Sequence, residues 1–345
     1  MPVSIVVISL CSVMVVINLL GNSLVCLVVL KDKAMRKTPM NFLLVNLAVS
    51  DMIVGVFSTF RFLIDNPFEN LRGTPAHVAC SFLTGATFMW IGILASVLFL
   101  VLIAVERYYA VLHPLHHRTG MVARKLKTIV TALWVYALAW NIPTFALFRY
   151  SDQTGRCFVL WSSPYLGQAR AIWWVINTAV VPVIIMGYLY IQIVRKLWKT
   201  LQRGRVPSEK ARRKVTRMTL IISMVYILTW IPNSVIFLLL QFSSLVTPDS
   251  PADQLGILLV TFNSCINPIV YSLHSTPFSK SLKNLLWCCR PRCKRNAVVP
   301  TTRMTLQRVE RDVDDTSYRN EDFVENRIES RLSEKSHQSI QGEST

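Results

Sequence analysis

Seven long apolar stretches constrain this chain more than any other feature of its sequence. Each holds few or no charges and is long enough for a helix to cross a hydrocarbon core, which needs about 20 residues. The stretches are too long for β-strand spans, and the backbone inside a bilayer must find its hydrogen bonds within the protein. We therefore expect an all-α membrane protein, a bundle of seven transmembrane helices. The stretches lie near residues 3–30, 39–64, 77–105, 128–148, 171–194, 218–242 and 255–273.

The distribution of charge predicts the orientation of this bundle. Hydrophobic residues make up 52% of the 345 residues and charged residues 16%, a balance that excludes a set of soluble domains. The net charge of +18 by itself fits either nucleic acid or an anionic membrane face. Lys and Arg gather, however, in alternate connections, at 31–37, 107–127, 195–217 and 280–295. Because cytoplasmic loops carry such an excess, we expect a plasma-membrane protein with its N-terminus outside and its C-terminus inside, and no nucleic-acid partner.

The two ends of the chain carry different expectations. The first apolar stretch lacks a basic N-region and exceeds a signal peptide's apolar length, so we interpret it as a retained helix. Few residues precede it, so either the binding site lies among the helices or the N-terminus is incomplete. We expect a seven-helix membrane domain over 1–290 and a disordered cytoplasmic tail over 291–345, where the sequence turns polar with mixed charge.

The segment after the seventh stretch has the pattern of an interfacial amphipathic helix over 277–289. Apolar residues recur from Phe278 to Leu286, and Lys280 and Lys283 occupy the polar side. Cys288 and Cys289 follow at the membrane surface, where they are either palmitoylation sites or reduced thiols.

Two further cysteines fall on the outer side, where the environment is oxidising. They are Cys80 and Cys157. A disulfide between them would tie the outer end of the third helix to the loop before the fifth; the alternative is two free thiols.

Asp51 lies well inside the second stretch, where an unpaired carboxylate would cost a few kcal/mol. We expect it to face the bundle and to have a partner. Nearby polar residues offer oxygen atoms that suit a sodium ion as an allosteric modulator, with no other cofactor; the alternative is an interhelical hydrogen-bond cluster. The expected sodium residues are Asp51, Ser96, Asn263, Ser264 and Asn267.

Several motifs occupy fixed positions within the apolar stretches. Met89, Ser96 and Arg107 share one stripe of the third helix because they are spaced by 7 and 11 residues. Proline interrupts each of the last four stretches, permitting kinks that neighbouring helices can support. These prolines are Pro143, Pro182, Pro232 and Pro268.

Taken together, the motifs resemble those of the rhodopsin-like (class A) G protein-coupled receptors, over residues 20–290. In chain order they are Gly21 with Asn22, Asn46 to Asp51, Glu106 to Tyr108, Trp134, Pro182 with Tyr190, Thr229 to Pro232, and Asn267 to Tyr271. Helices six and seven look closest to neuropeptide receptors of the galanin and allatostatin groups.

This resemblance implies roles for individual residues. Arg107, flanked by Glu106 and Tyr108, engages a heterotrimeric G protein, and Trp230 is a toggle beneath the ligand. Tyr190 and Tyr271 swing toward Arg107 on activation, with Pro232, Asn267 and Pro268 shaping the helices that move. Phosphorylated tail residues would bind arrestin; the candidates are Thr301, Thr302, Ser333, Ser336 and Ser339.

Some residues depart from the family pattern. Arg212 stands where some members have an acidic partner for Arg107, so we expect no ionic latch and raised basal activity. Cys80 lies about two residues too far from Arg107, which turns a helix by about 200°. A disulfide therefore requires an irregularity at the top of the third helix. Thr229 and Tyr226 replace the usual Cys and Phe.

The ligand class is narrowed by what is missing. Met89 stands where amine receptors need an Asp, and residues 252–275 hold no Lys for retinal, with Thr261 at the corresponding place. By the family's usual positions, the outer cavity would be lined by Arg61, Met89, Trp90, Trp174, Trp230, Phe237, Asp253 and Ile257. Aromatic side chains suit the apolar anchors of a short peptide, although Arg61 also suits an acidic lipid, and Trp173 suits an interfacial belt.

Other classes of protein fit less well. A transporter or channel would show internal repeats and broken helices, and we find no repeat. We do not expect an enzyme, because no nucleophile, base and orienting group lie at a common membrane depth.

Overall fold

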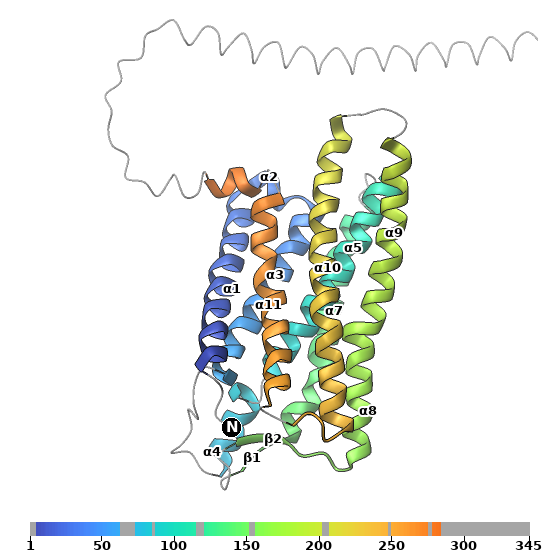
Figure 1. The fold of residues 1–345 in the computed structure, drawn as a ribbon. Helices are drawn as coiled ribbons and strands as arrows, with labels where there is room; N and C mark the ends of the chain where they lie inside the picture. Colours follow the sequence, from blue (N-terminus) through green and yellow to red (C-terminus); the bar gives the residue numbers. More distant parts are fainter. Residues whose placement is uncertain are drawn as a thin grey trace, which may run out of the picture. The chain divides into compact units, whose positions relative to one another are not determined.

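The computed structural model shows seven helices in its described residues that are long and apolar enough to cross a membrane (Figure 1), as predicted. The residues described are 5–62, 73–84, 87–114, 121–151, 156–201, 207–247, 250–274 and 278–283. The predicted tail and the cysteines Cys288 and Cys289 lie outside this part of the chain, so the predictions for them stay predictions.

Five spans consist of one helix each, and two consist of helices continued through a π-helical turn. The single helices are α1 (Ile5–Lys31), α3 (Pro39–Phe62), α7 (Met121–Leu147), α10 (Pro207–Phe242) and α11 (Pro251–His274). The third span combines α4 (Thr74–Ala79), η1 (Cys80–Thr84) and α5 (Thr87–Leu112). The fifth combines α8 (Pro164–Val175), η2 (Ile176–Val180) and α9 (Val181–Leu201).

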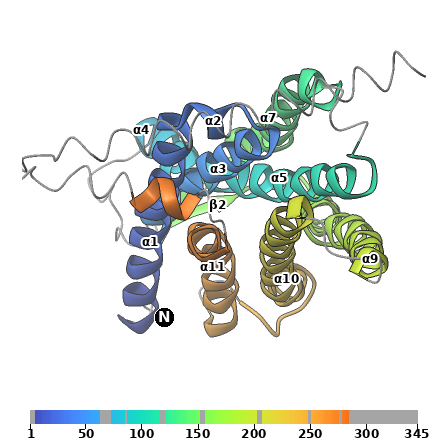
Figure 2. The same cartoon turned by 90° about the horizontal axis from the view of Figure 1, so that it is seen from above.

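The helix α5 lies at the centre of the bundle. It packs against α3, α7 and α9, while α1 packs against α3 and α11, and α10 packs against α11 (Figure 2). In the most apolar window of the third span 67% of the residues are buried, against 22% in the span formed by α7. A helix that is apolar all round belongs in such a central position, since every face meets another helix.

The top of the third span has the irregularity that the cysteine spacing predicted. Cys80 begins the π-helical turn η1 and forms a disulfide with Cys157, with a Cα–Cα distance of 5.7 Å. A π-helical turn takes in an extra residue and so changes the direction in which preceding side chains point. The disulfide predicted from the outer cysteines is confirmed.

A two-stranded hairpin lies at this end of the bundle, which we call the hairpin end. Strand β1 (Phe148–Ser151) pairs antiparallel with β2 (Arg156–Val159), and Tyr150 stands opposite Cys157. The backbone N–H of Tyr150 also donates to Nδ1 of His77 on α4, at 3.0 Å. The disulfide and this hydrogen bond hold the hairpin against the third span.

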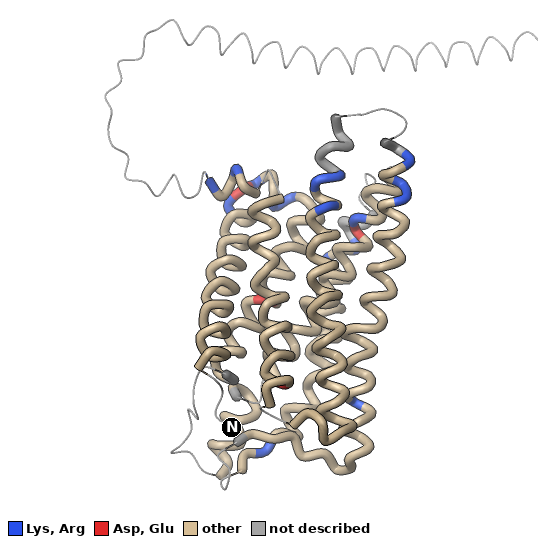
Figure 3. Tube along the Cα trace, in the orientation of Figure 1, with Lys and Arg blue, Asp and Glu red and all other residues tan. Residues whose placement is uncertain are grey.

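The opposite end carries most of the Lys and Arg drawn in Figure 3, and we call it the basic end. It includes α2 (Lys33–Arg36) and a short helix over 278–283. In that short helix Phe278 is buried and Leu282 packs on the core, while Lys280 and Lys283 are exposed. Over 278–283 this is the expected amphipathic pattern; the rest of the predicted segment 277–289 lies outside the described residues.

Candidate functional site inside the helix bundle

A buried carboxylate joins three helices in the middle of the bundle. Asp51 of α3 is fully buried and accepts hydrogen bonds from Ser96 Oγ on α5, at 2.9 Å, and from Asn267 Nδ2 on α11, at 2.8 Å. No Lys, Arg or His of the described residues forms an ion pair with it. Polar neighbours therefore satisfy the carboxylate, as a charge at membrane depth requires.

The polar cluster around Asp51 extends to α1. Asn22 is fully buried and donates through Nδ2 to the carbonyl oxygens of Asn18, at 3.0 Å, and Ser264, at 3.2 Å. Its neighbour Gly21 lies so close to Pro268 that a Cβ there would meet the proline ring at 2.9 Å. Glycine thus permits the close contact of α1 with α11 that the Asn22 hydrogen bond spans.

Several oxygen atoms near this cluster lack a partner among the described residues. They are the amide oxygens Oδ1 of Asn22, Asn263 and Asn267. Each of these side chains is at most 3% exposed. Because buried oxygen atoms rarely stay without a hydrogen bond or an ion, the donor set fits a hard monovalent cation or ordered water. The predicted sodium residues thus fit such an ion.

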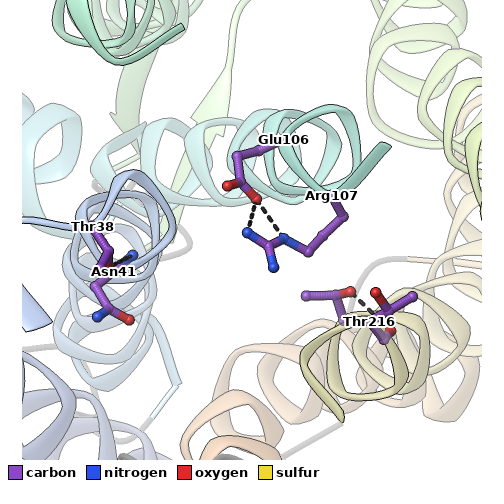
Figure 4. Close-up of polar contacts among 6 residues, drawn as sticks. Thr38, Asn41, Glu106, Arg107 and Thr216 are labelled. Carbon is purple, nitrogen blue, oxygen red and sulfur yellow. Dashed lines mark hydrogen bonds and ion pairs between the residues drawn. The ribbon is translucent and has the colours of Figure 1, made fainter. Parts of the chain in front are cut away.

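Arg107 at the basic end is held by a residue of its own helix. The guanidinium forms an ion pair with the adjacent Glu106, and both side chains are buried. Figure 4 shows this pair on α5, with Thr216 on α10, Asn41 on α3, and Thr38 just before the start of α3. The side chain of Arg212 lies outside the described residues, but α10 has no acidic residue from 213 to 242. Helix α10 therefore offers Arg107 no acidic partner over that range.

Two tyrosine hydroxyls lie buried among the helices. They belong to Tyr190 on α9 and Tyr271 on α11, whose side chains are 6% and 1% exposed. The Tyr190 hydroxyl lies beside the hydroxyls of Thr219 and Ser223 on α10 without a hydrogen bond of normal geometry, and the Tyr271 hydroxyl has no partner among the described residues. The ring of Tyr271 meets that of Phe278 edge-on at a centroid distance of 6.5 Å. Buried hydroxyls without partners are costly, so both groups are suited to gain one in another arrangement of the helices.

Other residues expected to take part in activation have different surroundings. Tyr108 is half-buried and its ring lies 5.6 Å from that of Tyr109. Pro232 is on the exposed face of α10, whereas Pro268 is buried against Gly21.

Trp230 lies deep in α10, nearer the hairpin end. Its side chain is 2% exposed, and its ring stacks near Tyr226 at 5.6 Å. The hydroxyl of Tyr226 donates to the carbonyl oxygen of Thr178 in η2. Pro182, four residues after Thr178, has no N–H to donate to that carbonyl in a helix, so the tyrosine supplies the missing donor.

The other residues expected to contact a ligand divide into three groups. Trp90 and Trp174 stack edge-on at 5.2 Å, and Met89 accepts a contact of 3.4 Å from the Ser58 hydroxyl. Phe237, Asp253 and Ile257 are half-buried. The side chain of Arg61 lies outside the described residues. Trp173 is 56% exposed, as expected of a lipid-facing belt.

The sequence profile described as "7 transmembrane receptor (rhodopsin family)" matches residues 21–271 of this chain. The chain belongs to that family. The match spans the polar cluster, the Glu106–Arg107 pair and the proline-containing helices, so the resemblance predicted from the motifs is confirmed. The receptor is a multi-pass membrane protein, and membership of this family of signalling receptors also confirms that it is not an enzyme.

Similar receptors carry neuropeptide names. Galanin receptor 2a of Danio rerio is 28% identical over 284 residues, 80% of this chain and 77% of that protein. The allatostatin-A receptor of Bombyx mori is 27% identical over 288 residues, 80% of this chain and 78% of its own length. Somatostatin receptor type 4 of Rattus norvegicus is 29% identical, covering 79% of this chain and 71% of the relative. The predicted likeness to neuropeptide receptors is confirmed.

Two features of the receptor were missed in the sequence. Arg170 of α8 donates to Trp140 O, at 3.1 Å, and to Thr144 Oγ1, at 2.8 Å, and thereby fastens α8 to α7. Asn18, one turn before Asn22, extends the polar cluster and is fully buried. The signal for Asn18 was its spacing of four from Asn22, whereas nothing in the sequence pairs Arg170 with α7.

Proposed function

We propose that this receptor binds a short extracellular neuropeptide at the hairpin end and activates a heterotrimeric G protein at the basic end, from the plasma membrane. The orientation rests on the basic end being cytoplasmic, because cytoplasmic loops carry an excess of Lys and Arg (Figure 3). The N-terminus is then extracellular and the C-terminus cytoplasmic. The names of the similar receptors support a peptide ligand.

The observation that carries this proposal is one buried hydrophobic core that includes Met89 and Trp230 as well as Tyr271 and Phe278, together with three polar or aromatic groups placed along it. Trp230 and Tyr226 lie toward the hairpin end of α10, and Asp51 joins α3, α5 and α11 in the middle. The Glu106–Arg107 pair lies at the basic end of α5. A change in helix packing at one end is therefore coupled to the other through side chains in contact.

On the ligand side, the peptide contacts the aromatic residues around Trp230 and Trp174. Aromatic side chains supply large apolar contact areas with few rotatable bonds, which suits them as anchors for peptide side chains. Phe237, Asp253 and Ile257 of α10 and α11 form the adjoining wall in this proposal. Arg61 and Asp253 are the charged residues that would meet opposite charges on the ligand. The peptide shifts the population only by binding the active arrangement more tightly than the resting one.

On the G protein side, α10 moves outward about the kink at Pro232. Proline removes one backbone hydrogen bond and weakens the helix there. The basic segment 210–217 can therefore move together with the half of α10 that lies toward the basic end. Arg107 then leaves Glu106 and contacts the G protein. Tyr190 and Tyr271 gain, in that arrangement, the hydrogen-bond partners that they lack in this one.

A sodium ion belongs to the resting state in this proposal. Asp51, Ser96 and the amide oxygens of Asn263 and Asn267 would hold it, with Ser264 adjoining, and the ion would neutralise the buried carboxylate. Arrestin is the proposed partner of the phosphorylated tail.

The test is second-messenger output, cyclic AMP and calcium in parallel, from cells that express the receptor. They are challenged with pooled short amidated peptides and then with acidic lipids. We expect a saturable peptide response that Trp230→Ala and Arg107→Ala abolish at equal surface expression. Trp173→Ala and Arg36→Ala are the matched controls, because both residues are exposed, and should leave the response intact. A response to lipids alone would show that the ligand is an acidic lipid and not a peptide.

A further inference from the structure

The short helix 278–283 is fastened to the connection between α1 and α3 by one pair of side chains. Ser281 Oγ donates a hydrogen bond of 2.9 Å to Oδ2 of Asp32. These residues are 249 positions apart in the chain, so the contact is a tertiary one. Figure 1 shows both segments at the basic end, where the short helix lies beside α2.

The carboxylate of Asp32 is also held in place by hydrogen bonds from α2. It caps the N-terminus of α2, where Oδ1 accepts from the backbone N–H groups of Ala34, at 2.9 Å, and Met35, at 3.2 Å. With Oδ1 engaged, Oδ2 is directed at Ser281. The pKa of the Asp32 carboxyl lies below its ordinary value because the Met35 N–H and the Ser281 hydroxyl bond to its ionised form. Asp32 therefore cannot turn away from Ser281 without giving up the cap.

The short helix depends on such contacts. Even over its predicted range 277–289, a helix of this length is only marginally stable by itself, because helix nucleation is costly and few turns follow it. Its described anchors are the Ser281 bond to Asp32, the hydrogen bond of 2.9 Å from Ser279 Oγ to Ser272 O, and the burial of Phe278 against Tyr271. Local opening of this segment is accordingly the easiest motion available to it.

Ser281 also has the surroundings that basophilic kinases select. Lys280 and Lys283 flank it and are exposed, and Ser281 itself is half-buried. An opened segment would present the sequence from Ser279 to Lys283 as an extended basic strand with a hydroxyl at its centre.

We propose that Ser281 is a phosphorylation site whose modification releases the short helix from Asp32. This rests on the proposed cytoplasmic position of the basic end. A protein kinase transfers the terminal phosphoryl group of ATP: an Oγ–P bond forms, the bond between the γ-phosphorus and its bridging oxygen breaks, ADP leaves, and the hydroxyl proton passes to the kinase base.

The product opposes the contact that the hydroxyl made. The phosphate ester has no O–H to donate and carries nearly two negative charges, which then face a fixed carboxylate at hydrogen-bonding distance. The same charges offset Lys280 and Lys283, which otherwise attach the helix to an anionic membrane surface. Both effects undock the helix. Because Phe278 packs on Tyr271, release reaches a residue that the proposed activation uses.

The first experiment measures hydrogen–deuterium exchange of peptides covering 278–283 in the purified full-length receptor in nanodiscs of zwitterionic lipid, where Lys280 and Lys283 have no anionic surface to bind. Ser281→Glu should exchange about threefold to fivefold faster than the unmodified receptor, the size expected of a partly exposed charge contact. Adding Asp32→Asn should slow exchange again, because the amide keeps the cap of α2 without the charge. Lys280→Glu is the matched control: it adds a negative charge on the exposed side and should exchange like wild type.

Equal exchange in Ser281→Glu and Lys280→Glu would show that the Ser281–Asp32 contact does not hold the short helix in place. The second experiment treats the purified receptor with a basophilic Ser/Thr kinase and ATP and locates phosphate by mass spectrometry. We expect phosphate on Ser281, reduced in Lys280→Gln/Lys283→Gln; phosphate confined to the tail would overturn the site.

Neither readout requires a ligand or a G protein, so loss of the proposed signalling would leave both unaffected. Antibody access to a C-terminal tag before and after permeabilising cells tests the orientation separately. A failure of the Ser281 proposal is therefore told apart from a failure of the proposed function.

Discussion

The hydroxyl of Tyr226 donates a hydrogen bond to the carbonyl oxygen of Thr178, and this contact ties α10 to the fifth span. Pro182 leaves that carbonyl without its usual helical donor, and Tyr226 stands where the family usually has Phe. The tie exists in an arrangement where Arg107 is paired with Glu106, so we assign it to the resting receptor.

Tyr226→Phe should therefore raise basal signalling. It removes one buried hydrogen bond, worth about 1 kcal/mol, and shifts the ratio of active to resting receptor by about fivefold. Ligand-independent second-messenger output at matched surface expression is the measurement. Tyr136→Phe is the control, since it removes a hydroxyl bonded to Asn177 between α7 and η2 on an exposed face. Equal basal output in both variants would contradict this role for Tyr226.

Glu106→Gln should also raise basal signalling, and for a different reason. It removes the only ion-pair partner that Arg107 has among the described residues. Removing one member of a buried pair leaves the other charge uncompensated, which destabilises that arrangement by about 3–5 kcal/mol unless the charge binds another group. Guanine-nucleotide exchange on purified G protein is the readout. A basal rate at or below that of wild type would show that the pair does not hold the resting state.

Sodium should stabilise the receptor through Asp51. Thermal unfolding of the purified receptor in sodium chloride should occur at a higher temperature than in choline chloride, because an ion that binds the folded state stabilises it. Asp51→Asn should abolish this difference, whereas Asp32→Asn, an exchange of the same kind at the basic end, should preserve it. A difference that survives Asp51→Asn would place the ion elsewhere.

The disulfide should contribute measurably to stability. Cys80 and Cys157 are 77 residues apart, and a closed loop of that length is worth about 4 kcal/mol in the chain-entropy account. Cys80→Ala, Cys157→Ala and the double variant should therefore lose a similar amount of thermal stability. Cys11→Ala is the control, because Cys11 is a free buried thiol and loses only a small side chain. Additive losses in the double variant would argue against a shared bond.

Docking of the short helix should not vary with pH in the physiological range. The pKa of Asp32 lies below its ordinary value of 3.8, so the contribution of the ionised carboxylate is complete above that value. It is lost only as the pH falls through the lower value of the folded receptor. Exchange of 278–283, corrected for its intrinsic pH dependence, should be constant from about pH 8 to about pH 5. A marked rise over that interval would identify a different titrating group.

Much of the fold follows from the sequence because the bilayer leaves few solutions. Long apolar stretches such as 3–30 and 218–242 admit only helices at membrane depth, since every backbone group must be bonded within the chain. The spacing of Cys80 from Arg107 even predicted the irregular turn at the top of the third span. Fixed motif positions placed Asp51, Ser96 and Asn267 in one cluster.

The sequence did not predict the contacts between residues that are distant in the chain. In the sequence, Ser281 between two lysines indicates only a polar surface. The structure shows that its Oγ lies 2.9 Å from Oδ2 of Asp32, the residue that caps α2. Arg170 counts only as an outer charge until α8 packs on α7, where the carbonyl of Trp140 and the hydroxyl of Thr144 accept from it.

The sequence by itself determined the number of spans, their polar motifs and the uneven distribution of charge, because each depends on local composition and spacing. The tertiary structure decided which groups meet. Side-chain contacts depend on the rotation and tilt of each helix against its neighbours. The π-helical turns η1 and η2 and the prolines at positions 182 and 268 affect both in three dimensions. The Tyr226 bond to Thr178 and the Ser281 bond to Asp32 exist only once those rotations are fixed.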